Sequence, residues 1–306
     1  MNWLVEDFED LFKTGRLNRA VALSKALKKH SISPVYFSHT LLPHYPVRNL
    51  SASTVFIHLN PGAGVGKIVD EGLFFNQTWN YEKFLIDFNL KPEASIHEAI
   101  GAYKDYWRNY ATNRFIKNSE KDNFDYKQAC FLLHWKDSGI HLNWSNLKDP
   151  EVQKQNTVNV LDQKLQLELI PYCSNALDTN LLINSFEKEP EILKPYIEYL
   201  LDVIAMHPRK YILFGSRVFQ RLFRLYHKNI NPIIEFEAPE AKFKGITFKS
   251  LSFSYIRLNW RDKILETGLA HSFPRRDLPN AFEKMAKYGE VCFYEFCNHV
   301  LKNRSY

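Results

Sequence analysis

Ser53-Thr-Val-Phe-Ile-His-Leu59 is followed directly by the turn residues Asn60-Pro-Gly62. An apolar, β-branched run that stops at a Pro-Gly pair predicts a buried strand. Further strands are predicted at residues 163–170, 210–214 and 243–253, with helical segments between them. Strands that alternate with helices indicate parallel crossovers. The sequence therefore predicts an α/β fold, with a three-layer αβα arrangement around a central, mainly parallel four-stranded sheet.

Helical patterns on either side of the first strand set the expected domain organisation. Residues 3–30 are typical of one or two short helices that break at Thr14-Gly15. We therefore expect residues 1–50 to form an N-terminal helical extension. Residues 51–306 are expected to form one α/β domain, with a helical insertion at about residues 76–160.

The composition is typical of a globular protein and excludes several classes. The chain has 306 residues, of which 45% are hydrophobic and 24% are charged. No apolar run approaches the roughly 18 residues that a membrane helix needs. The acidic start lacks the basic and then apolar character of a secretory signal. We therefore expect a cytoplasmic protein without a membrane partner.

Metal and cofactor signatures are missing from the sequence. The cysteines form no C-x-x-C pair, and the histidines show neither H-x-x-x-H nor H-E-x-x-H spacing. These spacings are the usual marks of zinc and iron–sulfur sites. The sequence therefore predicts no metal and no cofactor, and it gives no sign of an obligate protein partner.

Basic residues are gathered in two stretches of a chain whose formal net charge is +6. Residues 13–29 and residues 209–228 each hold six Lys or Arg and no acidic residue. Aromatic residues make up 15% of the chain. Phosphates attract cations and unstacked bases stack on flat side chains, so this composition favours a nucleic-acid partner.

The loops at the carboxyl ends of the predicted strands are where an α/β fold binds its ligands. The first of them, Gly62-Ala-Gly-Val-Gly-Lys67, is similar to a phosphate-binding loop. It is one residue short of the G-x-x-x-x-G-K spacing, however, and Ile68 follows where Ser or Thr is needed. A nucleotide hydrolase and a plain glycine turn are both alternatives at this loop.

Four motifs in these loops occur in a fixed order along the chain: Leu59-Asn60-Pro61-Gly62, Glu168 to Asn175, Ile212-Leu-Phe-Gly215-Ser216 and Ala270-His271-Ser272-Phe273-Pro274. Together they resemble the uracil-DNA glycosylase superfamily, over about residues 53–300. The first motif resembles the Asn-Pro-Gly motif of its mismatch-specific thymine/uracil branch. The last resembles the family's His-Pro-Ser motif, with Phe273 where proline is usual. Some bacterial relatives are similar to defence enzymes that remove modified cytosines from phage DNA, so the resemblance also allows an anti-phage role as an alternative to DNA repair.

The resemblance implies a role for each motif, beside a structural alternative in which the same residues only shape turns or pack. Asn60 would position the hydrolytic water, and His271 would donate a hydrogen bond to the departing base. The implied base pocket consists of Pro61, Phe74, Phe75, Tyr172, Ser174 and Asn175. The implied DNA contacts are Ser216, Arg217, Ser272, Phe273, Arg275 and Arg276, with Phe273 as an apolar wedge.

The resemblance implies a monofunctional DNA N-glycosylase that acts without a metal. It would flip a uracil-like, mismatched or modified base out of DNA and hydrolyse the N-glycosidic bond. DNA is the expected partner. A non-catalytic nucleic-acid-binding protein on the same fold is the main alternative, and a nucleotide hydrolase that uses Gly62–Lys67 is a second one.

Overall fold

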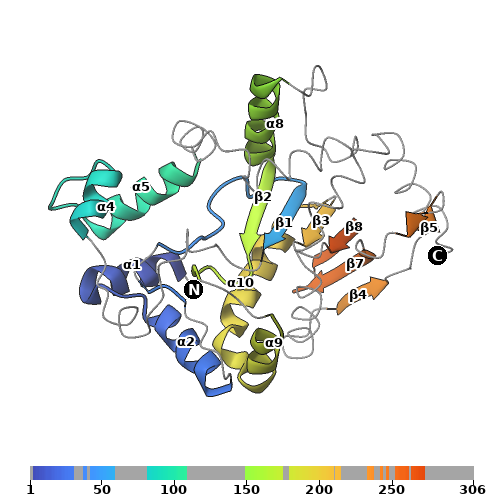
Figure 1. The fold of residues 1–306 in the computed structure, drawn as a ribbon, viewed down its shortest axis with the longest axis horizontal. Coiled ribbons are helices and arrows are strands. Elements are labelled where there is room, and N and C mark those ends of the chain that lie inside the picture. Colours follow the sequence, from blue (N-terminus) through green and yellow to red (C-terminus); the bar gives the residue numbers. More distant parts are fainter. Residues whose placement is uncertain are drawn as a thin grey trace.

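A computed structural model shows that the chain forms a mixed α/β fold (Figure 1). The structure describes residues 3–30, 37–39, 42–58, 81–108, 149–174, 179–209, 211–214, 233–237, 242–243, 246–247, 252–261 and 263–272. Helices account for more of these residues than strands do. Among the helices in these ranges, none combines the length and the apolar character that crossing a membrane requires.

The helices and strands are listed here in chain order. The helices are α1 (Trp3–Thr14), α2 (Asn18–His30), α4 (Tyr81–Asp87), α5 (Ile96–Arg108), α8 (Pro150–Gln163), α9 (Thr179–Lys188) and α10 (Lys194–Ala205), with a short 3-10 helix at Pro190–Ile192. The strands are β1 (Thr54–His58), β2 (Lys164–Glu168), β3 (Tyr211–Phe214), β4 (Ile233–Glu237), β5 (Lys242–Phe243), β6 (Ile246–Thr247), β7 (Ser252–Trp260) and β8 (Lys263–Ser272).

The main sheet has six strands in the order β2-β1-β3-β8-β7-β4 (Figure 1). The strands β2, β1, β3 and β8 run parallel to one another, whereas β7 runs antiparallel to both β8 and β4. The four parallel strands end within one residue of one another. His58 pairs with Glu168, Ile57 pairs with Phe214, and Phe214 pairs with Ser272. The carboxyl ends of the four parallel strands therefore lie at one edge of the sheet.

Local sequence accounts for how the chain enters β2. Asp149 caps α8 by accepting a hydrogen bond from the Glu151 amide at 2.9 Å, and Pro150 takes the first helical position. The helix passes directly into the strand at Lys164, whose backbone is extended. Leu165 and Leu167 then alternate with polar residues and are fully buried.

The N-terminal helices share one hydrophobic core with the sheet. Phe8 and Leu11 of α1, Val55 of β1 and Leu165 of β2 belong to the same cluster of buried side chains as the inner face of α10. The α1 helix lies beside α5, and α2 lies beside α9 (Figure 1). The break predicted at Thr14-Gly15 is confirmed, since Gly15 has a φ of 69° between the two helices.

The structure corrects the predicted strands at one position. Strands within residues 53–59, 163–170 and 210–214 are confirmed as β1, β2 and β3. The fourth strand predicted at 243–253, with a break at Gly245, is confirmed only as strand residues: the region holds the end of β5, all of β6 and the start of β7, and β5 and β6 form a separate small sheet. It is not the fourth parallel strand of the main sheet. The fourth parallel strand is β8, which forms a hairpin with β7 at Arg261, and the sheet has six strands instead of four.

Candidate functional site

The carboxyl edge of the parallel strands is the candidate site, because ligands of α/β folds bind there. At this edge β1 ends at His58, β2 at Glu168, β3 at Phe214 and β8 at Ser272. The ladder between β1 and β2 extends one step further, since the Leu169 amide donates to the His58 carbonyl at 2.8 Å.

A line of polar side chains runs along one face of β2 toward this edge. The Lys164 Nζ donates to the Gln166 Oε1 at 2.8 Å, and the Gln166 Nε2 donates to the Glu168 Oε1 at 2.8 Å. Lys164 is only 2% exposed and Glu168 only 3% exposed. The Gln166 amide thus bridges a buried cation and one oxygen of a buried carboxylate, which offsets part of the cost of burying both charges.

Two histidines lie close to this polar line. The His44 Nδ1 is 3.9 Å from the Glu168 Oε1, and the His44 ring meets the Trp107 ring edge-on with centroids 4.2 Å apart. The His58 ring stacks on Phe56, with centroids 6.2 Å apart. Burial, and then the charges of Lys164 and His44, hold the pKa of His58 well below its usual range. His58 is therefore a neutral imidazole at neutral pH.

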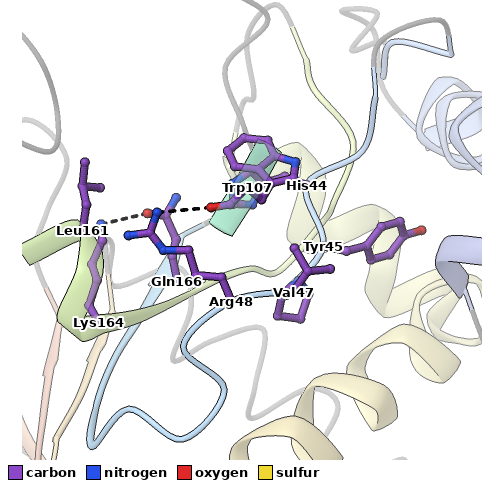
Figure 2. Close-up of a pocket in the computed structure, with 9 residues that line it drawn as sticks. His44, Tyr45, Val47, Arg48, Trp107, Leu161, Lys164 and Gln166 are labelled. Carbon is purple, nitrogen blue, oxygen red and sulfur yellow. Dashed lines mark hydrogen bonds between the residues drawn. The ribbon is translucent and has the colours of Figure 1, made fainter. Parts of the chain in front are cut away.

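A small pocket opens beside the start of β2 (Figure 2). Its volume is about 40 Å³, which is room for a few water molecules and not for a nucleobase. It is lined by His44, Tyr45, Pro46, Val47, Arg48, Trp107, Leu161, Lys164 and Gln166. Arg48 is already engaged, donating to the Trp107 carbonyl at 3.2 Å and to Asp162 at 3.0 Å.

Four of the site residues predicted from sequence have described surroundings or strand positions. The Tyr172 side chain is fully buried and its hydroxyl donates to Asp7 of α1 at 3.0 Å, so it faces the N-terminal helix. Ser174 is 5% exposed and forms an antiparallel bridge with Phe37. His271 lies within β8, opposite Leu213, and not in a loop as predicted. Ser272, also predicted in that loop, is the last residue of the same strand.

The remaining predicted site residues lie outside the described ranges. They are Asn60, Pro61, Phe74, Phe75, Asn175, Ser216, Arg217, Phe273, Arg275 and Arg276, together with the Gly62–Lys67 loop.

Sequence reasoning missed Glu168, His44 and His58 as candidate functional residues. The signal that marks Glu168 is the alternation of Lys164, Gln166 and Glu168 with leucines. This pattern predicted the strand correctly, but a polar strand face is ordinarily solvated. In the structure that face is buried, and the register places Glu168 beside His58.

Arg209, the first residue of the basic stretch 209–228, has a structural role. It is 2% exposed, and its guanidinium donates to the backbone carbonyls of Val203 and Ile204 in α10 and of Leu50 and Ala52 ahead of β1. Burial lowers the pKa of Arg209 to about 10, so it stays charged at neutral pH. This residue anchors the chain ahead of β3 instead of facing a nucleic acid.

Within the part of the chain that the structure describes, no group of three or more His, Cys, Asp or Glu is arranged to hold a metal ion. Comparison of the whole chain with protein-family models, with curated proteins and with solved structures gives no match.

Proposed function

We propose that this protein is a monofunctional DNA N-glycosylase with a three-layer αβα fold of the uracil-DNA glycosylase type. It flips a uracil-like, mismatched or modified base out of DNA and hydrolyses the bond between base and sugar. The observation that carries the proposal is the common carboxyl edge of β2, β1, β3 and β8. The chain reaches Asn60 two residues after β1 ends at that edge, and His271 is the next-to-last residue of β8.

The proposed reaction needs an oriented water molecule, a proton acceptor and a donor to the departing base. The water oxygen bonds to C1′ of the sugar as the C1′–N bond breaks, and the electron pair of that bond leaves with the base. Asn60 orients the water, the Glu168 carboxylate accepts its proton, and His271 donates to a carbonyl oxygen of the base. Glu168 matters because an amide such as Asn60 is a poor base.

DNA binding in this proposal relies on backbone contacts that offset the cost of extruding a nucleotide. Ser216, Arg217, Ser272, Arg275 and Arg276 are the residues assigned to the phosphates, and Phe273 is the wedge. If about five phosphates are bound, the logarithm of the affinity should fall with the logarithm of salt concentration with a slope of roughly −4 to −5.

The test uses duplex and single-stranded DNAs that carry uracil, a thymine mismatch, hydroxymethylcytosine or its glucosylated form. Abasic products are revealed by cleavage with alkali. We expect product from at least one DNA, and we expect Asn60→Ala to lose turnover while it keeps DNA affinity. Asn159→Ala on α8, which removes an exposed amide bonded to Gln155, is the matched control. DNA binding without product from any substrate would reject the enzyme in favour of a non-catalytic binder.

A further inference from the structure

Asp7 of α1 is a fully buried carboxylate that joins three separate parts of the chain. Its Oδ2 accepts hydrogen bonds from the Tyr45 hydroxyl at 2.5 Å and from the Tyr172 hydroxyl at 3.0 Å. Its Oδ1 accepts from the Arg19 guanidinium of α2 at 2.8 Å. Burial raises the pKa of Asp7 to about 7, so above that pH the group is charged, and hydrogen bonds to a charged group are about twice as strong as neutral ones. The carboxylate therefore ties Tyr172 to both N-terminal helices.

The backbone on either side of Tyr172 is hydrogen-bonded to the segment that follows the N-terminal helices. The Ser38 amide donates to the Cys173 carbonyl at 2.7 Å, and the His44 amide donates to the Pro171 carbonyl at 2.7 Å. Phe37 pairs with Ser174 in an antiparallel bridge. Phe37, Ser38 and His44 therefore hold the Pro171–Ser174 segment, which follows shortly after the end of β2.

We propose that Asp7 is a positioning residue, which acts through Tyr172 to hold the Pro171–Ser174 segment where it reads the extruded base. This inference rests on the proposed function, because the family resemblance assigns Ser174 and Asn175 to the base pocket. Asp7 touches neither the base nor the sugar in this account. Its effect comes from buried hydrogen bonds, which a shift of the Pro171–Ser174 segment would break.

The thiol of Cys173 offers a readout that does not depend on enzyme activity. It is half-buried within the Pro171–Ser174 segment, and burial raises its pKa to about 12. Alkylation by iodoacetamide needs an accessible thiolate, so the rate at this residue reports opening of the segment. The rate is measured by mass spectrometry on the peptide that contains Cys173, in folded protein.

The test compares Asp7→Asn, Tyr172→Phe and the control Asp162→Asn, in which a half-exposed carboxylate loses its charge. Loss of one charged hydrogen bond, at about 1.5 kcal/mol, should speed alkylation of Cys173 by about tenfold in the first two variants. Asp162→Asn should leave the rate unchanged. Tyr172→Phe keeps the ring and the bond between Asp7 and Arg19, so it serves if Asp7→Asn does not fold.

Glycosylase assays on the same variants complete the test. We expect the ratio of kcat/KM between the preferred base and a competing base to fall about tenfold in Asp7→Asn and Tyr172→Phe, with DNA affinity unchanged. Unchanged alkylation of Cys173, or faster alkylation with unchanged base selectivity, overturns the positioning role alone. Absence of glycosylase activity in the wild-type protein overturns the proposed function and, with it, this inference.

Discussion

His58 and Glu168 occupy the last paired positions of β1 and β2, so an imidazole and a buried carboxylate end neighbouring strands at the same edge. The strand end is fixed from the other side, because the Tyr196 hydroxyl of α10 donates to the Glu168 carbonyl at 3.0 Å. The Gln166 amide orients the carboxylate itself. A charged group held on rigid elements in this way suits a chemical role better than one on a loop.

Glu168→Gln is expected to slow base removal without weakening DNA binding. Glutamine has the same size and can still accept from the Gln166 amide, but it cannot take up a proton. Loss of a general base typically slows a reaction by about 10²- to 10⁴-fold, so we expect the single-turnover rate to fall at least about 100-fold. The measurement is a quench time course with saturating enzyme and the preferred DNA.

The control for this variant is Glu151→Gln on α8, where the carboxylate is 81% exposed. It should excise the base at the wild-type rate. A wild-type rate in Glu168→Gln as well would remove Glu168 from the reaction and leave only its structural role beside His58.

The buried carboxylate of Asp7 should make stability depend on pH. Burial raises its pKa from 3.8 to about 7, although the hydroxyls of Tyr45 and Tyr172 lower it and the charge of Asp10 raises it further. Arg19 also faces this carboxylate. The folded state therefore binds a proton that the unfolded state has released between about pH 4 and pH 7. The free energy of unfolding should fall as the pH rises through this window and level off above it.

The measurement is the Tm as a function of pH from 4 to 8. Asp7→Asn should flatten this part of the profile, because an amide does not titrate. Asp162→Asn should keep the wild-type slope, since its carboxylate is 52% exposed. A wild-type slope in Asp7→Asn would show that another group causes the pH dependence.

Arg209→Lys is expected to destabilise the protein although the charge is kept. A lysine ammonium has three donors on one atom and cannot reproduce the guanidinium fork that reaches four carbonyls. We expect the free energy of unfolding to fall by about 3 kcal/mol, as for other broken buried charge contacts. Urea unfolding measures this loss. Arg108→Lys, at an exposed site paired with Asp105, should change little.

Strands could be predicted well from the sequence where they are short, buried and ended by a turn. The segments that became β1, β2 and β3 have this character, because apolar or alternating residues stop at glycine, proline or a polar turn. The strand β8 could not be predicted, because Lys263–Ser272 mixes Lys, Glu and His with apolar residues. It owes its place to pairing with β3 on one side and β7 on the other.

The candidate site was less predictable because its polar residues depend on register and burial. In the sequence Glu168 is only the first residue of the Glu168 to Asn175 motif. Its neighbours along the chain do not indicate that His44 and His58 lie close to it. Tyr172 shows the reverse case. Its position after β2 favoured a base pocket, but the partner that decides its orientation is Asp7, which is distant in sequence.

Asp202→Ala is expected to loosen the hairpin that carries His271. The Trp260 indole donates to the Asp202 carboxylate at 2.6 Å, and Arg261 at the hairpin turn forms an ion pair with it at 3.1 Å. These contacts fix the β7–β8 turn to α10. Leaving the indole, on a residue only 7% exposed, without its acceptor should lower the free energy of unfolding by about 2 kcal/mol in urea. Asp202→Asn keeps an acceptor oxygen and should lose less, so equal losses in both variants would mean that charge, and not the indole bond, secures the turn.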